Sequence, residues 1–304
     1  MRASRATRRT SSVRSVSHKE MRRNRWGAGL ILGLTTVIVL VPFLWMISIA
    51  FTPEKEAFGS ISLIPSHPTL GNFTTALVNA NLIRALLNSA IVAVVAVSAN
   101  CLIAVMAGYA FVMLPFPGRT PLFYLLVSTT AIPGSVTLIP LFLIARGIPL
   151  VGGNDIVGQG GSGLLDTLAG VVLPYLVMPM NIFLARQFFS TAPIELSEAA
   201  RIDGAGEWRI FSRIYLPLAR PLVAVVAIFS FTAVWSDFLW PLVVTSSARM
   251  QTVQLALARF LSAGNVQYGP LMAGAVLVTL PVLVIFLFNQ RSFISGLSEG
   301  SLKG

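Results

Sequence analysis

The chain has little charge for its size. Only 11% of its 304 residues are Asp, Glu, Lys or Arg, whereas 55% are hydrophobic. Soluble globular chains carry about 25% charged residues, so this composition argues against a soluble domain and indicates an integral membrane protein. Apolar runs of roughly 20 residues cross a bilayer. The sequence predicts six such spans, over about 27–51, 86–113, 121–145, 167–188, 222–245 and 269–289.

Residues that carry catalytic or metal-binding chemistry are also scarce. The two histidines, His18 and His67, are far from an i, i+4 spacing, so a His-Glu-x-x-His zinc site is excluded. The single cysteine, Cys101, cannot form an intramolecular disulfide. None of the lysines follows a glycine, which excludes a Gly-Lys-Ser/Thr phosphate-binding loop. The sequence therefore predicts no catalytic residue, no metal site and no cofactor.

The net charge of +11 is unevenly distributed. Seventeen of the 22 Lys and Arg residues fall in four segments: the first 26 residues, the link between spans two and three, the link between spans four and five, and the C-terminal end. The positive-inside rule places these four segments in the cytoplasm. This pattern favours a membrane topology signal over a nucleic-acid site. We expect residues 1–26 to be a basic cytoplasmic tail that contacts lipid headgroups, 27–291 the six-span domain, and 292–304 a cytoplasmic C-terminal tail.

A polar segment interrupts the apolar pattern between spans four and five. Pro193 suits the first turn of a helix, and helix-favouring residues continue to Ile202. Gly204 then marks a turn. Trp208, Phe211 and Tyr215 follow at helical spacing and predict a second helix with one apolar face. On this pattern alone, the segment is an amphipathic hairpin, and a hairpin lying on the membrane surface remains an alternative.

The spacing inside this hairpin resembles the signature loop of ABC importer permeases. That pattern is Glu-Ala-Ala, three residues, Gly, nine residues, Ile, one residue and Leu-Pro. The matching residues are Glu198, Ala199, Ala200, Gly204, Ile214, Leu216 and Pro217. Four further features are similar to the carbohydrate-importer branch, to which the maltose-type inner permease subunit belongs: Asp203-Gly204-Ala205 with Phe211, the runs 107–111 and 116–119, the run 235–242, and the tail 296–304.

The resemblance implies an all-α integral membrane protein with six transmembrane helices, the type I ABC importer permease fold and both termini in the cytoplasm. It implies a multi-pass permease subunit in the cytoplasmic membrane that forms half of the path for a sugar. The loop 190–217 would couple the chain to two ATPase subunits, which would hydrolyse the ATP. A second permease and an extracytoplasmic solute-binding protein complete the implied complex. Glu198, Arg201 and Asp203 are then expected to face solvent or a partner.

Three alternatives remain open. The first is an ABC permease for another solute, such as a polyol, glycerol phosphate or an oligopeptide. The second is an intramembrane enzyme, which the missing His, Cys and paired carboxylates oppose. The third is a self-sufficient channel or carrier, which usually needs several membrane carboxylates.

Polar residues inside the spans indicate candidate positions along a transport path. Asp237 is a carboxylate within the fifth apolar run, and such a group is costly in a bilayer unless it faces water or a partner. Helical spacing predicts Ser230, Ala233 and Pro241 on its face. Asn181 follows two prolines in span four, a pattern typical of broken helices beside a path. The alternative is that these groups only pack or anchor helices. Between spans three and four, the glycine-rich run 151–163 predicts a flexible, outward-facing loop.

Overall fold

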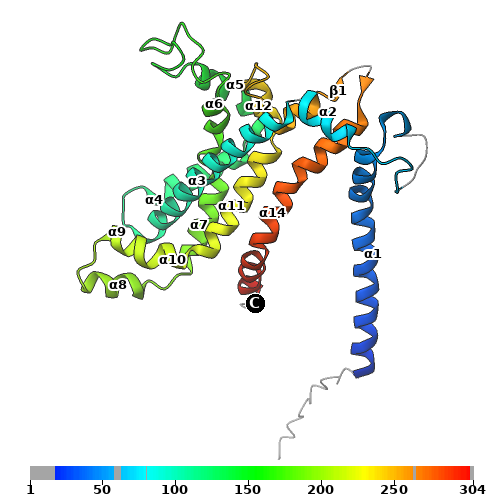
Figure 1. The fold of residues 1–304 in the computed structure, drawn as a ribbon. Coiled ribbons are helices and arrows are strands. Elements are labelled where there is room, and N and C mark those ends of the chain that lie inside the picture. Colours follow the sequence, from blue (N-terminus) through cyan, green and yellow to red (C-terminus); the bar gives the residue numbers. More distant parts are fainter. Residues whose placement is uncertain (1–17, 58–62, 80, 263–264, 302–304) are drawn as a thin grey trace, which may run out of the picture.

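A computed structural model describes residues 18–57, 63–79, 81–262 and 265–301, and within them the fold is predominantly helical (Figure 1). The helices are α1 (His18–Phe51), α2 (Gly71–Asn79), α3 (Leu82–Met113), α4 (Arg119–Ser128), α5 (Gly134–Arg146), α6 (Leu168–Val172), α7 (Pro179–Ser190), α8 (Glu195–Ile202), α9 (Glu207–Ile210), α10 (Leu216–Leu218), α11 (Arg220–Ser236), α12 (Leu239–Val244), α13 (Val253–Ala258) and α14 (Tyr268–Ser301). Shorter elements are the 3-10 turns η1 (Glu54–Glu56), η2 (Thr129–Ala131) and η3 (Leu173–Tyr175), the π-helical turn η4 (Phe211–Tyr215), and the antiparallel strands β1 (Leu261–Ser262) and β2 (Asn265–Val266).

Within the described residues, three helices are long and apolar enough to cross a membrane: Gly27–Phe51, Leu82–Met113 and Tyr268–Phe288. Three bent helix pairs bring the number to as many as six if each pair is one span. Residues 1–17 and 302–304 of the two expected tails lie outside the described residues. The described parts of these tails are helical, because α1 begins at His18 and α14 continues to Ser301.

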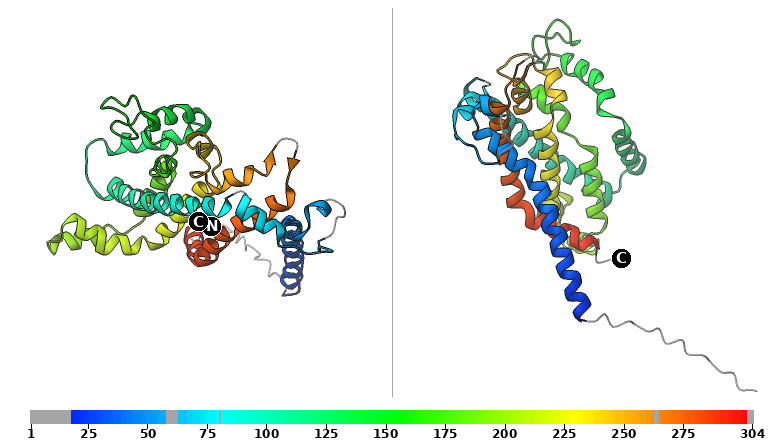
Figure 2. Two further views of the ribbon diagram at one scale, coloured as in Figure 1. Left: turned by 45° about the horizontal axis from the view of Figure 1, so that its top comes forward. Right: turned by 90° about the vertical axis from the view of Figure 1, so that its right-hand side faces the viewer.

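The expected third span is sharply bent. The helix pair Arg119–Ala131 and Gly134–Arg146 meets at 108°. Pro133 lacks an amide hydrogen and its ring clashes with a helical residue before it, so Ile132 adopts an extended backbone with ψ 119°. Figure 2 shows that α4 and α5 consequently lie to one side of α3, α7 and α11.

The fifth span is broken as well. The sequence predicted one helix through 222–245, but α11 ends at Ser236 and Asp237 has an extended backbone (φ −73°, ψ 130°) before α12 begins at Leu239. The helical spacing that placed Ser230, Ala233 and Pro241 on the face of Asp237 is therefore wrong beyond Ser236.

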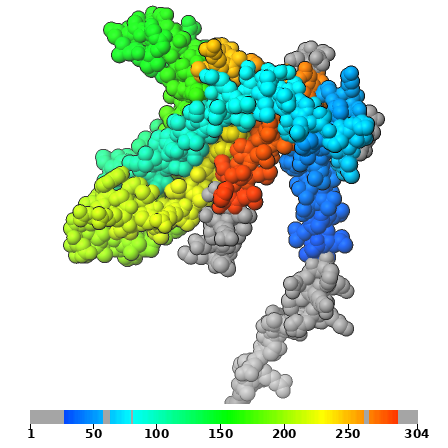
Figure 3. Space-filling view, viewed as in Figure 1, coloured from blue at the N-terminus to red at the C-terminus, as the bar shows by residue number. Residues whose placement is uncertain are grey.

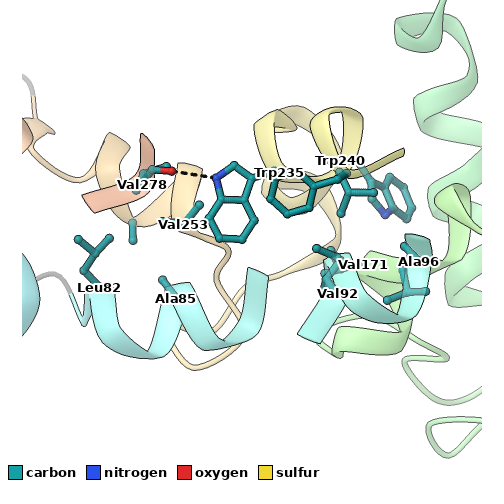
Figure 4. Close-up of a cluster of buried hydrophobic side chains, with 14 of the residues drawn as sticks. Leu82, Ala85, Val92, Ala96, Val171, Trp235, Trp240, Val253 and Val278 are labelled. Atoms are coloured by element: carbon teal, nitrogen blue, oxygen red, sulfur yellow. Dashed lines mark hydrogen bonds between the residues drawn. The ribbon is translucent and has the colours of Figure 1, made fainter. Parts of the chain in front are cut away.

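Helix α3 lies at the centre of the fold and packs against α7 and α11 (Figure 1). Small residues allow the closest approach: a Cβ atom at Gly108 would lie 2.4 Å from the Cβ of Ala185 in α7. Around these helices the buried side chains form two clusters, one at each end of the bundle. In the first, the indole of Trp235 donates a hydrogen bond to the carbonyl of Val278 in α14 (3.1 Å; Figure 4).

Helix α1 forms an arm beside the bundle, packed against α14 and α2 (Figure 3). Most of its apolar side chains are exposed in the isolated chain. Its C-terminal end is held by Asn72 of α2, whose buried amide donates to the carbonyls of Ile49, Ala50 and Thr52 at 3.4, 3.0 and 2.7 Å. These bonds satisfy acceptors that a helix end otherwise leaves unpaired.

The glycine-rich run 151–163 has a defined fold, contrary to the expected flexible loop. The buried side chain of Asn154 donates to the carbonyls of Arg146 and Ile148 and accepts from the amide of Gly161. Gly163 has φ +59°, and a Cβ atom there would lie 2.2 Å from the carbonyl oxygen of Arg146. The glycines therefore permit close backbone contacts that hold the loop together.

Candidate functional site

The hairpin that the sequence predicted over 193–217 is built from α8, α9, η4 and α10 (Figure 1). Gly204 ends α8 with φ +77°, a left-handed conformation that residues with a Cβ adopt at a cost. The amide of Gly204 donates to the carbonyl of Arg201 (3.0 Å) and the amide of Ala205 to that of Ala200 (2.9 Å). This pair of bonds is a Schellman motif, which turns the chain sharply toward α9.

An ion pair fixes the far side of this turn. Arg201 donates to the carboxylate of Glu207 at 2.7 Å, and the hydroxyl of Tyr109 in α3 donates to the same carboxylate at 3.3 Å. The hydrogen bond from Arg201 lowers the pKa of Glu207, so the carboxylate stays ionised at neutral pH. Arg201 faces solvent, as expected, and it is also paired within the chain, because the turn brings Glu207 next to it.

An aromatic cluster anchors the second half of the hairpin to the membrane helices. Tyr215 is fully buried, and its ring centroid lies 5.3 Å from that of Tyr109 and 6.1 Å from that of Phe189 in α7. Its hydroxyl donates to the carbonyl of Pro193 (2.9 Å), which ties the end of the hairpin to its beginning. Phe211 packs beside Tyr109 at 5.1 Å. The sequence did not predict the roles of Tyr109, Phe189 and Glu207, although Tyr109 lies in one of the family-like runs.

The signature residues divide between this anchored side and a free outer side. Phe211 is buried, and Ala200, Ala205 and Ile214 are half-buried. Glu198, Ala199, Asp203, Gly204, Leu216 and Pro217 are exposed. Ile202 is 86% exposed and Trp208 is 66% exposed, so the outer side presents apolar surface next to Glu198 and Asp203. Trp208 was expected on the apolar face of the second helix, but it lies at the exposed edge of the aromatic cluster, where its ring packs against Phe211.

Two of the three path candidates are joined by hydrogen bonds. The amide of Asn181 in α7 donates to the side-chain oxygen of Asn100 in α3 (2.6 Å) and to the hydroxyl of Ser230 in α11 (2.9 Å). Ser230 in turn donates to Asn100 (3.0 Å). All three side chains are buried, so in this conformation they fasten α3, α7 and α11 together. Asn100 was not among the predicted site residues.

Asp237 lies apart from this polar cluster, at the break between α11 and α12. Its carboxylate accepts a hydrogen bond from the hydroxyl of Tyr175 in η3 and another from the amide of Leu239 (2.9 Å). Asp237 is half-buried, whereas Tyr175 is buried. The structure therefore pairs Asp237 with a tyrosine from span four that the sequence gave no reason to choose.

A large groove of about 920 Å³ opens between α3, α11 and α14. Apolar side chains such as Leu86, Val94, Phe231 and Leu280 line it, and Ser98 is the one hydroxyl among the described residues that line it. A hydrophilic solute would lose its hydration there without gaining hydrogen bonds. The groove is therefore suited to an acyl chain or an apolar helix.

The sequence of this chain is similar to those of a known protein family. Residues 100–296 match the family described as binding-protein-dependent transport system inner membrane component. The diacetylchitobiose uptake system permease protein NgcG of Streptomyces coelicolor is 32% identical, over 89% of this chain and 86% of its own. The arabinooligosaccharides transport system permease protein AraQ of Halalkalibacterium halodurans is 36% identical, over 88% and 92%. The sn-glycerol-3-phosphate transport system permease protein UgpE of Agrobacterium fabrum is 32% identical, over 90% and 95%.

A solved structure has the same fold. The crystal structure of a bacterial ABC transporter involved in the import of the acidic polysaccharide alginate superposes with a TM-score of 0.75, at 20% identity, over 91% of this chain and 98% of its own. The resemblance read from the hairpin is thereby confirmed, and the chain belongs to the family of inner membrane components of binding-protein-dependent transport systems, the permeases of ABC importers.

Proposed function

We propose that this permease forms half of the transmembrane path for a sugar and that the hairpin 193–217 couples the path to two partner ATPase subunits. The observation that carries the proposal is the two-sided hairpin. One side is fixed to α3 and α7 by Tyr109, Phe189 and Tyr215, and the other presents Glu198, Ala199 and Ile202 without an internal partner surface. An element built this way can bind a protein outside the membrane and move the helices inside it.

The connections of the hairpin support a mechanical role. It follows α7 directly, and its second helix meets α11 at an angle of 74°. A partner that displaces α8 would therefore move the inner ends of α7 and α11 together. This is a two-state element whose balance depends on a bound partner.

The remaining partners follow from the family and from topology. A second permease would complete the path, and an extracytoplasmic solute-binding protein would deliver the solute. The hairpin, the first residue of α1 and the last turns of α14 lie at the same end of the molecule (Figure 1). With the positive charges of these segments, this arrangement supports a cytoplasmic location for both termini in the cell membrane.

Asp237 is the best candidate for a wall of the path. Sugars carry hydroxyl groups that can donate to a carboxylate, and Asp237 already accepts from the hydroxyl of Tyr175. A sugar hydroxyl would replace the hydroxyl of Tyr175 as the donor to the carboxylate of Asp237. Ser230 and Asn181 would reach the path only if the buried cluster with Asn100 opened during transport.

Several relatives named for oligosaccharides favour a sugar, including a lactose transport system permease protein, LacG of Rhizobium radiobacter (30% identical). The UgpE relatives favour glycerol phosphate as the second candidate. Uptake by the assembled importer of labelled disaccharide and of labelled glycerol 3-phosphate separates the two. Uptake of the glycerol phosphate alone would refute the sugar assignment and leave the permease assignment intact.

Coupling is tested by cross-linking. A cysteine at Ile202 should cross-link to an ATPase subunit within the assembled complex, since Ile202 is the most exposed of the hairpin's apolar side chains given above. A cysteine at Ser162, in the loop at the opposite end, serves as the control (Figure 1). Cross-linking from Ser162 but not from Ile202 would refute the coupling role.

A further inference from the structure

A small polar cavity lies beside the hairpin, where three helices end. It has a volume of about 180 Å³ and is formed by the last residues of α3, the first turns of α4 and the last turn of α7. Arg119, Thr120, Arg186 and Ser190 supply its polar side chains. Ser190 is the first residue of the loop 190–217, but none of the four is a signature residue of the hairpin or a path candidate.

Within the described residues, neither guanidinium group of the cavity forms an ion pair with a carboxylate. In the part of the chain that the structure describes, the ion pair between Arg201 and Glu207 is the one found, and it lies outside this cavity. Two positive charges that share one small cavity repel each other, so an anion that contacts both is favoured. The planar guanidinium matches the oxygen geometry of phosphate particularly well.

The side chain of Arg186 is held in a fixed direction. Its guanidinium carbon lies 4.2 Å from the ring centroid of Phe123, which is itself buried and packs at 5.5 Å from Phe111. Phe111 and Phe123 also line the cavity. A cation held over an aromatic ring loses less freedom when it binds an anion. The cavity is therefore partly organised before a ligand arrives.

The surroundings of the cavity indicate an amphiphilic ligand. Arg119 begins α4, and the following turns of that helix expose Leu122, Tyr124 and Leu125 by 49%, 64% and 66%. In a membrane these side chains would face acyl chains. Arg119, at the start of α4, and Arg186, near the end of α7, would lie close to the headgroups on the side of the hairpin. A headgroup phosphate in the cavity would place its acyl chains against Leu122 and Leu125.

We infer that this cavity binds the phosphate of an anionic phospholipid from the leaflet on the side of the coupling hairpin. Basic cavities between membrane helices on the cytoplasmic side are a recurring way to hold such headgroups. The site goes beyond the proposed transport role, since it requires no solute. It would fix the end of α7 against α3 and α4, immediately before the hairpin begins.

Native mass spectrometry of the purified, assembled importer tests this inference. The complex is first exchanged into vesicles of phosphatidylcholine that contain phosphatidylglycerol, and the phosphatidylglycerol retained after extraction is measured. Loss of one charge-assisted contact predicts about tenfold weaker retention for Arg119→Gln and for Arg186→Gln. Arg146→Gln removes the same charge at the far end of α5 and should retain the lipid like the wild type.

Three results would overturn the inference. Equal retention by the wild type and both cavity variants would show that the cavity does not hold the lipid. Displacement of phosphatidylglycerol by millimolar inorganic phosphate would identify free phosphate as the ligand. Loss of ATPase subunits from the variants with lipid retention unchanged would assign the arginines to a protein partner. Arg119→Gln keeps the inference testable even if loss of the contact with Phe123 disturbs folding of the Arg186 variant.

Discussion

Replacing Gly204 tests whether the shape of the hairpin transmits force. Gly204 has φ +77°, and a Cβ atom there would meet no other atom within 4 Å. A substitution would therefore act through the backbone conformation alone, without a steric clash. The left-handed conformation costs a residue with a Cβ about 1–2 kcal/mol, and the β-branched side chain of valine increases this cost. Gly204→Val should reduce the population of the turned hairpin by a factor of about 5 to 30.

The expected result is a joint loss of uptake and of sugar-stimulated ATP hydrolysis, with normal insertion of the helices. Gly204→Asn is the matched control, because asparagine tolerates the left-handed region better than valine. Co-purification of the ATPase subunits shows whether they dissociate or stay bound without moving the helices. If Gly204→Val and Glu198→Lys both kept the ATPase bound and stimulated by sugar, the hairpin would not be the coupling element.

Three other predictions follow from buried polar contacts and from topology. The Asp237→Leu variant should insert normally but take up sugar more slowly than the wild type. Asp237→Asn should have a smaller effect, because asparagine still accepts a hydrogen bond. Uptake by Asp237→Leu at the wild-type rate would leave Asp237 with a packing role only. Topology is tested with single cysteines in a Cys101→Ala background and an impermeant thiol reagent added to intact cells. A cysteine at Ser162 should react and a cysteine at Ser212 should not. The reverse pattern would refute the predicted orientation in the membrane. Asn72→Leu removes three hydrogen bonds from the end of α1 and should destabilise the fold by about 1–3 kcal/mol. Asn79→Leu, on the exposed side of the same helix, should leave the unfolding temperature nearly unchanged.

The sequence was informative where local chemistry decides the structure. The hairpin and its turn could be predicted because a glycine between two helical patterns has few alternatives. The membrane character could be predicted from the lengths of the apolar runs, because a run of about 20 apolar residues matches the thickness of a bilayer. The bend at Pro133 has a local cause in the proline, but its angle of 108° depends on how α4 and α5 pack against the rest of the chain.

The break at Asp237 illustrates what the sequence could not provide. The residues from Trp235 to Leu239 contain neither proline nor glycine, so periodicity favoured an unbroken helix. The carboxylate accepts from Tyr175, which is 62 positions away in the chain, and from the amide of Leu239. A contact at that separation leaves no local pattern. Composition misled in a similar way at the glycine-rich loop, because the carbonyls that hold Asn154 become neighbours only after folding.

The polar contacts of the spans divide the molecule into an inner part and an outer part. Asn181 lies in the first turn of α7, just past the 43° bend in span four, and it joins α7 to Asn100 and Ser230. The inner part of the molecule runs from this polar cluster to the hairpin. Within it, the polar cluster joins α3, α7 and α11 at the end away from the hairpin, and the aromatic cluster joins them at the end next to the hairpin. Tyr175 and Asp237 each lie beyond the cluster, at the breaks of spans four and five. On the proposed function, a displacement of the hairpin moves the inner part as one body, and the breaks are where that movement changes the distance between Tyr175 and Asp237.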